Sequence, residues 1–223
     1  IKLKCPIYKI SSFEMTDFSL LKKIATTKKP IIISTGMANM KEIELTYNTA
    51  IKYGIKDITL LYCVSNYPSK NSDFNLNNIK IIKEKFNCRV GLSDHSKDNN
   101  VARAAVAAGA EVVEKHIALE GQSSGLDINF SLKGVEIQNF KSAIDETYNL
   151  LGDKKFTRNK SEDDSKLFRR SIFAIEQIKK GEKFTILNIK RIRPSHGISP
   201  MYYEKIINRI SPINISKNEP ITI

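Results

Sequence analysis

Residues 89–117 read RVGLSDHSKDNNVARAAVAAGAEVVEKHI, and the pattern within this stretch decides the fold class. A short apolar run at 89–94 leads into an alanine-rich helical pattern that Gly109 is suited to close, and a second apolar run follows at 111–117. Both runs are almost continuously apolar, as strands buried on both faces of a sheet are. The stretch therefore predicts a strand, a helix and a second strand parallel to the first.

The same alternation of strand and helix extends back to the beginning of the sequence. Three further apolar runs predict strands: PIYKI at 6–10, PIIIS at 30–34 and ITLLYC at 58–63. Helical patterns lie between them, at 17–27 with Asp17 as its cap, at 40–54 with Gly54 at its end, and at 76–86. A last long helix is predicted from the helical spacing of Ile137, Phe140, Ile144, Tyr148 and Leu151. Five strands alternating with helices predict parallel βα units, either a barrel or a doubly wound sheet.

The composition changes after the last of these helices. Residues 152–166 are charged and nearly free of large apolar side chains, which is typical of a linker. A tail of short predicted strands and turns follows. We therefore place a βα domain at 1–151, a linker at 152–168 and a small β-rich domain at 169–223.

The tail contains an internal repeat. IKKGEKFT at 178–185 and ISKNEPIT at 215–222 agree at Ile, Lys, Glu and Thr, and Gly181 is matched by Asn218. Glycine and asparagine are the residues that adopt positive φ most easily. The repeat therefore predicts the same turn in both copies and a small pseudo-symmetric module.

Composition and charge narrow the class of protein. The 223 residues are 41% hydrophobic, which is enough for one medium and one small domain. The net charge of +12 invites a nucleic-acid partner, but the lysines are interleaved with Asp and Glu over nearly every predicted element, which suits small anionic substrates better. No apolar run approaches the roughly 20 residues of a membrane span, and the first residues lack the pattern of a secretory signal. We expect a cytoplasmic protein with neither a membrane nor a nucleic acid as partner.

The three cysteines, Cys5, Cys63 and Cys88, are odd in number and far apart. Their spacing is not that of a metal site, and an odd count argues against a disulfide framework. We expect reduced thiols packed in the interior.

Polar side chains follow each of the five predicted strands, where the working residues of parallel βα folds collect. They are Lys9, Ser11 and Ser12; Ser34, Thr35 and Gly36; Ser65, Asn66 and Tyr67; His95; and His116. A serine or threonine after a strand more often caps a helix than binds a ligand, so no single position decides the function.

Two histidines at neighbouring strand ends are a more specific signal. Side chains alternate along a strand, so Ser93 shares a face with His95, and Glu114 with His116. If the two strands pair, the imidazoles lie about 5 Å apart and can bind one divalent metal. A lone histidine at such a place is more often structural, whereas a pair favours a ligand role. Lys115 is expected to point outward and to make an ordinary contact with a helix.

Several segments together resemble the sialic acid synthase family. They are YKISSFEMTDFSLLKKIATTKKPIIISTGMANMKEI, GLSDHS and EKHIAL, and the tail from RRSIFAIEQIKKGEKFT to NIKRIRPSHGISP resembles the family's antifreeze-like (SAF) domain. The resemblance implies a partial TIM-type (β/α) barrel followed by an SAF domain. It also implies condensation of phosphoenolpyruvate with an amino-sugar aldehyde to a nine-carbon acidic sugar, with cleavage of a C–O bond of the phosphate ester.

The resemblance also implies roles for single residues. His95 and His116 match the pair that holds a manganese ion, with Mg²⁺ or Co²⁺ as alternatives, and Glu114 and Lys9 become the catalytic candidates. Substrate ligands are implied at Lys9, Ser12, Ser34 and Ser93 for phosphoenolpyruvate, and at Tyr67, Glu114 and Asp127 for the sugar. Ser65 is a further substrate-binding candidate. Arg193 matches an arginine that enters the neighbouring subunit's active site, which implies a homodimer with a swapped C-terminal domain.

Two positions favour one branch of the family. Sialic acid synthases proper carry asparagine at the position of Ser65 and a histidine shortly after that of Asp127, but this chain has VSNYP and GLDINFSL. These runs, with RPSHGISPMYYEKI at 193–206, look more like pseudaminic acid synthases, whose substrate is a 2,4-diacetamido-2,4,6-trideoxy-altrose. The alternative is an N-acetylneuraminate or legionaminic acid synthase that uses a manno-type N-acetyl sugar.

One motif of the family has no counterpart. Its members begin with strands that carry a catalytic glutamate in an E-I-x-x-N-H-x-G-like motif, which nothing in this sequence matches. The resemblance thus implies about five of the eight βα units of a barrel, too few to close it. We expect the isolated chain to be poorly soluble and inactive, with an exposed edge at 6–10. Outside the enzyme class, a basic nucleic-acid-binding protein and a non-catalytic sugar-binding remnant are the alternatives.

Overall fold

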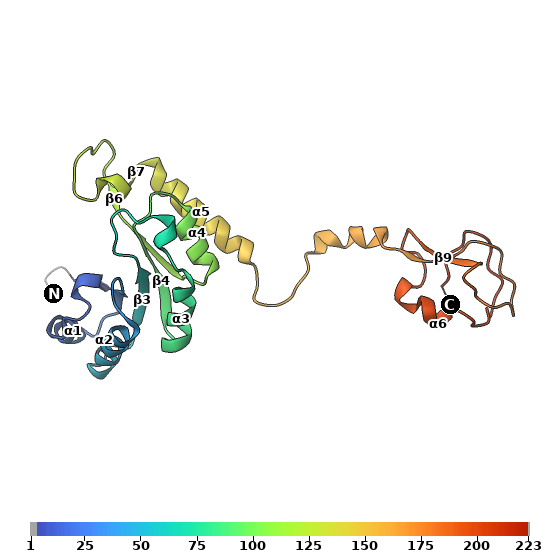
Figure 1. Cartoon of the computed structure of the whole chain (residues 1–223), viewed down its shortest axis with the longest axis horizontal. Coiled ribbons are helices and arrows are strands. Elements are labelled where there is room, and N and C mark those ends of the chain that lie inside the picture. The colour runs from blue at the N-terminus through green and yellow to red at the C-terminus, as the bar shows by residue number, and fades with distance from the viewer. Residues whose placement is uncertain (1–3, 223) are drawn as a thin grey trace. The chain divides into compact units, whose positions relative to one another are not determined.

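Figure 1 presents the computed structural model of the chain, which describes residues 4–222. The chain divides into two compact units, one ending at Gly152 and the other beginning at Asp153. Among the described residues, none of the helices combines the length and the hydropathy that a membrane crossing needs.

The first unit is built on a five-stranded parallel sheet. Its strands follow the order of the sequence: β1 (Tyr8–Ile10), β2 (Ile31–Ser34), β3 (Ile58–Cys63), β4 (Arg89–Asp94) and β5 (Val112–Lys115). The helices that connect them are α1 (Phe18–Ala25), α2 (Met40–Lys52), α3 (Asn77–Phe86) and α4 (Asn100–Ala107). Each helix returns the chain to the same end of the sheet, as parallel pairing requires. The predicted parallel βα arrangement is confirmed, in the form of a half-barrel.

Alternation along the strands separates a core face from an open face. Ile33, Leu60 and Leu92 are buried in the main hydrophobic cluster, which the helices cover. Gly91 and Ser93, the residues on either side of Leu92, face the opposite way. The open face is therefore the one on which the polar residues of the strand ends gather.

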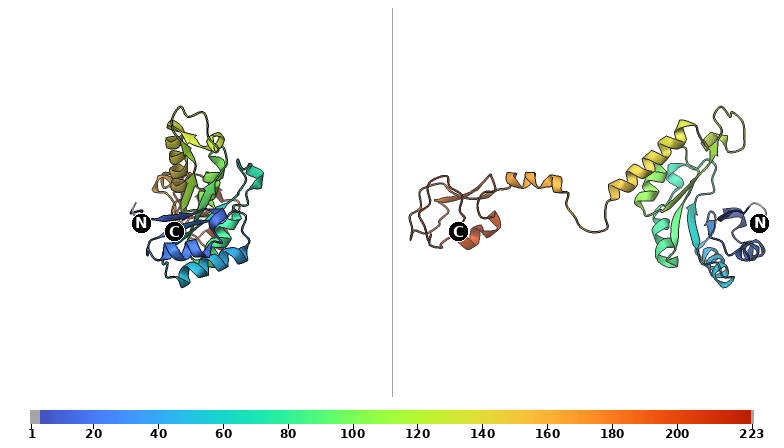
Figure 2. Two further views of the ribbon diagram at one scale, coloured as in Figure 1. Left: turned by 90° about the vertical axis from the view of Figure 1, so that its left-hand side faces the viewer. Right: turned by 180° about the vertical axis from the view of Figure 1, so that it is seen from behind.

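The predicted capping residues lie at the boundaries of the helices. Oδ1 of Asp17 accepts hydrogen bonds from the backbone N–H groups of Ser19 and Leu20, both at 3.0 Å. Gly54 and Gly109 follow α2 and α4 with φ of 88° and 102°, conformations that favour glycine. The predicted last helix is α5 (Val135–Leu151), which lies alongside α4 (Figure 2).

A short strand pair extends this unit beyond β5. β6 (Ile117–Ala118) and β7 (Leu132–Lys133) are parallel, and the backbone N–H of Leu132 donates to the carbonyl of His116 at 2.9 Å. The sequence does not predict β7, because two residues are too few to show a strand pattern. His116 thus lies where the chain passes from β5 to β6.

The second unit begins with an exposed segment. Residues 153–168 are exposed throughout, and within them the chain forms two short 3-10 helices, η4 (Lys160–Glu162) and η5 (Asp164–Phe168). A compact module follows, with antiparallel β8 (Ser171–Ala174) and β9 (Ile189–Ile192), the 3-10 helix η6 (Pro200–Tyr202) and the short α6 (Tyr203–Ile206).

The repeat predicted in this module is confirmed. Ile178 and Ile215 exchange two backbone hydrogen bonds, at 2.9 and 2.8 Å. Gly181 and Asn218 both have positive φ, 90° and 68°. In each copy the backbone N–H after the isoleucine donates to the glutamate four residues after that isoleucine: Lys179 to Glu182 at 2.9 Å and Ser216 to Glu219 at 2.6 Å.

Candidate active site

An open cavity of about 450 Å³ lies at the carboxyl ends of the parallel strands. Nine of the residues predicted for a site line it: Lys9, Ser12, Ser34, Tyr67, Ser93, His95, Glu114, His116 and Asp127. Ser11, Phe13 and Cys63 complete the lining. The polar residues from all five strands therefore converge on one place.

The two adjacent strands β4 and β5 carry the centre of this cavity. Ser93 is directly opposite Glu114 in the register, and Oγ of Ser93 donates to Oε1 of Glu114 at 2.8 Å. Nζ of Lys9 lies 3.5 Å from the other carboxylate oxygen of Glu114. The glutamate is thus held between a hydroxyl and an ammonium group, each from a different strand.

The histidine rings lie side by side in the cavity. The ring centroids of His95 and His116 are 5.2 Å apart. Nδ1 of His95 lies 3.1 Å from the carbonyl oxygen of Val64, and Nδ1 of His116 lies 3.5 Å from Oδ2 of Asp127. An oxygen partner for one ring nitrogen is the arrangement that leaves the other nitrogen free for a metal ion.

The protonation state of His116 also suits a ligand. Burial in the cavity, and to a lesser degree the neighbouring His95, lowers the pKa of His116 below its ordinary value of 6.5. A neutral imidazole is the form that binds a metal. Within residues 4–222 no group of three or more His, Cys, Asp or Glu side chains surrounds a common point. The two histidines could hold a divalent ion as two of its ligands.

The β1 and β2 side of the cavity holds hydroxyl groups. Oγ of Ser34 is buried and has no hydrogen-bond partner among residues 4–222. Oγ of Ser12 accepts from the backbone N–H of Gly36 at 2.9 Å. A buried hydroxyl without a partner costs free energy, which a ligand that bonds to it would recover. This side of the cavity is suited to an oxygen-rich substrate group.

Aromatic rings surround the histidines. The Tyr67 ring lies 4.2 Å from that of His95, and Phe130 meets His116 edge-on at 5.1 Å, centroid to centroid. Burial raises the pKa of the Tyr67 hydroxyl, which stays protonated at neutral pH. Sequence reasoning missed Phe130, which the 3-10 helix η3 (Ile128–Phe130) places against the rings. No pattern in the sequence marks it, since it follows a loop and not a strand.

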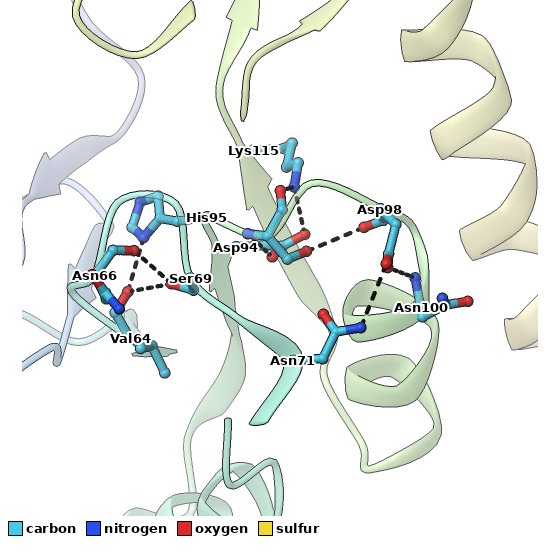
Figure 3. A network of polar contacts seen from close by, with 10 residues as sticks. Val64, Asn66, Ser69, Asn71, Asp94, His95, Asp98, Asn100 and Lys115 are labelled. Carbon is cyan, nitrogen blue, oxygen red and sulfur yellow. Dashed lines mark hydrogen bonds and ion pairs between the residues drawn. The ribbon is translucent and has the colours of Figure 1, made fainter. Parts of the chain in front are cut away.

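The prediction for Lys115 was wrong in one respect. It points away from the cavity and lies over the Phe140 ring of α5, as an outward residue should. Instead of an ordinary contact, however, it forms a buried ion pair in which Nζ lies 2.9 Å from Oδ2 of Asp94 (Figure 3).

Two further predicted residues lie outside the cavity lining. Ser65 does not line it, although its Oγ lies 3.9 Å from Sγ of Cys63, which does. Arg193 belongs to the second unit and is exposed directly after β9. Its role remains a prediction.

Comparison with known proteins identifies the relatives of this chain. The profile of the NeuB family matches residues 1–156 and that of the SAF domain matches residues 169–223. The N,N'-diacetyllegionaminic acid synthase of Campylobacter jejuni is 40% identical over 99% of this chain and 67% of its own length. The pseudaminic acid synthase of the same organism is 39% identical over 91% of this chain.

A solved structure agrees over both units. That of a spore coat polysaccharide biosynthesis protein E from Chromobacterium violaceum aligns with a TM-score of 0.77 at 28% identity, over 97% of this chain and 66% of that one. The chain spans 59% of the length of the pseudaminic acid synthase, so it covers about three fifths to two thirds of these three relatives. These matches show that the chain belongs to the NeuB, or sialic acid synthase, family and ends in an SAF domain.

Proposed function

We propose that this protein condenses phosphoenolpyruvate with an amino-sugar aldehyde to give a nonulosonic acid and inorganic phosphate. The observation that carries the proposal is the convergence of Lys9, Glu114 and the two histidines on one cavity. The ammonium group of Lys9 can bind an anionic substrate, and a metal ion on the two histidines can polarise an aldehyde. The carboxylate of Glu114 can move a proton. The known synthases among the relatives support the same reaction class.

In the proposed reaction carbon 3 of phosphoenolpyruvate attacks the aldehyde carbon. Water adds at carbon 2, and phosphate leaves by cleavage of its bond to that carbon. Lys9 offsets the charge of the anionic groups, and the hydroxyls of Ser12 and Ser34 bind their oxygens. Glu114, held by Ser93 and Lys9, is the group that we assign to proton movement on the substrate.

His95 and His116 would hold a divalent ion, Mn²⁺ in our proposal, that polarises the aldehyde oxygen when bound. Tyr67 and Asp127 line the cavity beside the two rings and are proposed to contact the sugar. Three cysteines without disulfides agree with a cytoplasmic enzyme, the compartment that we propose.

The preferred sugar is proposed to be the altro-configured 2,4-diacetamido aldehyde, which makes the product pseudaminic acid. Ser65 and the GLDINFSL run favour this branch. Identities of 40% and 39% to the legionaminic and pseudaminic acid synthases leave both within the proposal. The sugar of the legionaminic and neuraminic branches is the alternative substrate.

The test is an assay of the full-length protein, as the cell makes it, with phosphoenolpyruvate and each aldehyde in parallel. We expect Mn²⁺-dependent release of phosphate that is faster with the altro-configured sugar. Faster release with the manno-configured sugar would move the protein to the other branch. Binding of sugar without phosphate release would instead support a sugar-binding remnant, and nucleic-acid binding that weakens steeply with salt would support the basic binding protein.

A homodimer with a swapped SAF domain is the assembly that we propose, with Arg193 serving the partner's cavity. Mixing an Arg193→Ala protein with a His116→Ala protein tests this. Each variant alone lacks one required group at every site, whereas in a mixed dimer one cavity receives both. We expect activity to reappear on mixing, after denaturation and joint refolding. No recovery in a mixture that contains mixed dimers would overturn the swapped arrangement.

A further inference from the structure

The residues directly before His95 and His116 form a buried ion pair with each other, on the face of the sheet opposite the cavity. Nζ of Lys115 lies 2.9 Å from Oδ2 of Asp94, and the two side chains are 5% and 0% exposed. Asp94 directly precedes His95, and Lys115 directly precedes His116. Because side chains alternate along a strand, the pair faces the helices while the two histidines face the cavity.

The pair also holds the turn that follows His95. The carboxylate of Asp94 accepts from the backbone N–H of Ser96 at 2.8 Å, and Nζ of Lys115 donates to the carbonyl of Ser96. Both oxygens of Asp94 are therefore occupied. The backbone on either side of His95 is thereby tied to β5 through a single side chain.

The strand register makes this pair the final cross-link before the histidines. Asp94 and Lys115 are the last partners in the β4–β5 ladder. One step later the backbones part: the carbonyl of His95 accepts from Ser69 at 3.0 Å, and that of His116 accepts from Leu132 at 2.9 Å. The separation of the two rings then depends on the final link that joins their strands.

A gain in stability does not by itself explain why an ion pair, and not a pair of apolar side chains, lies at this position. The desolvation of two buried charges offsets much of their attraction, and apolar side chains of similar volume often serve as well or better. Phe140, Leu132 and Ala102 supply an apolar cluster at this place, and the Phe140 ring lies over the ammonium group. A directional link between the two strands is what apolar residues would not provide.

We propose that Asp94 and Lys115 are positioning residues that set the spacing of His95 and His116 for a shared divalent cation. Neither residue lines the cavity, so each acts through the histidine next to it. The inference rests on the proposed function in one respect, namely that the two rings bind one ion. The spacing of the rings itself is open to measurement without any metal.

The test compares three variants of the full-length protein: Asp94→Asn, Lys115→Met and the double variant. Each single change leaves a buried charge unpaired, so we expect both to lower the melting temperature. The double change removes both charges, so most of the lost stability should return. Affinity for Mn²⁺ alone, measured by calorimetry, should fall about tenfold or more in all three, as it does when groups that orient metal ligands are removed.

A matched control is Lys83→Met, which breaks an exposed ion pair with Glu111, the residue directly before β5. It should keep the Mn²⁺ affinity of the unaltered protein. A double variant that regains Mn²⁺ affinity together with stability would reduce the pair to a structural role and overturn the proposal.

Crystals of the metal-free double variant supply the second readout. We expect the ring centroids to lie further apart than the 5.2 Å of the unaltered protein. An unchanged separation would overturn the positioning role. If the unaltered protein binds no Mn²⁺, the metal site of the proposed function fails, and the ring separation then decides only whether the ion pair positions the two rings.

Discussion

Ser93 and Glu114 are joined across the two strands that carry the histidines, with the hydroxyl donating to the carboxylate at 2.8 Å. The second carboxylate oxygen lies 3.5 Å from Nζ of Lys9. The glutamate is therefore fixed in the cavity by groups of the protein itself. We expect such a carboxylate to keep its place when a substrate binds, as a catalytic group requires.

Glu114→Gln should lower turnover with little effect on the fold. Glutamine keeps an oxygen for the Ser93 hydroxyl but has no charge and no basic oxygen. We expect kcat for phosphate release to fall about 100-fold or more, while the melting temperature changes little because the Glu114 side chain is 39% exposed. Glu111→Gln, outside the cavity, is the control. Unchanged turnover in Glu114→Gln would remove this residue from the chemistry.

His116→Ala should abolish Mn²⁺ binding and Mn²⁺-dependent activity, because one imidazole cannot replace the pair. The fold should survive, since the side chain is 35% exposed. Calorimetry with Mn²⁺ and circular dichroism measure the two effects. His196→Ala, an exposed histidine of the second unit, should bind Mn²⁺ as the unaltered protein does. Full activity in His116→Ala would count against the metal assignment.

Ser34→Ala should have opposite effects on stability and on substrate binding. Its buried hydroxyl has no partner in the described part of the chain, so its removal should raise the free energy of unfolding by up to about 1 kcal/mol in the absence of ligands. The KM for phosphoenolpyruvate should rise because a proposed ligand is lost.

Ser171→Ala is the matched control, since that buried hydroxyl donates to the carbonyl of Pro194 at 2.7 Å. It should lower stability by about 1 kcal/mol. Denaturant unfolding checks both signs. A loss of stability in Ser34→Ala equal to that in Ser171→Ala would show that Ser34 has a partner in solution.

Gly91→Ala should destabilise the first unit. A Cβ atom at this position would stand 2.1 Å from the carbonyl oxygen of Val112, which is backbone of the adjacent strand. We expect the free energy of unfolding to fall by about 2–3 kcal/mol, which denaturant unfolding shows as a lower midpoint.

The comparison is Gly121→Ala, where a Cβ atom would meet no atom of the described residues within 4 Å and the positive φ of 77° opposes the change. The free energy of unfolding of that variant should fall by about 1 kcal/mol. Equal losses would mean that the close approach of β4 and β5 is relieved by movement of the sheet.

Asn218→Gly should be tolerated in the SAF module, whereas Asn218→Ala should cost about 1 kcal/mol. The backbone at Asn218 has φ of 68°, a conformation that glycine adopts without strain and alanine does not. Thermal unfolding of the chain measures the difference. If both variants unfold alike, the turn has changed conformation in response to the substitution.

Some features of the fold follow from short patterns in the sequence. Asp17 caps α1, and Gly109 follows α4, because a capping oxygen and a left-handed glycine act over a few neighbouring residues. The histidine pair follows from strand alternation and from the tendency of consecutive strands to pair. These rules need no knowledge of distant parts of the chain.

Other features depend on tertiary contacts that the sequence does not display. Lysine and aspartate are ordinarily exposed, and the burial of Lys115 and Asp94 requires α5 to pack over this part of the sheet. Phe130 reaches the histidines only because the loop between β6 and β7 folds back.

The reciprocal bonds between Ile178 and Ile215 have a consequence for how the SAF module forms. Each copy of the repeat forms backbone hydrogen bonds with the other copy, which is distant in the sequence. Neither copy can therefore complete its hydrogen bonds before both are present. Contacts of such wide separation slow the search for the native arrangement. During synthesis the SAF module should therefore remain unfolded until residues 215–222 have left the ribosome.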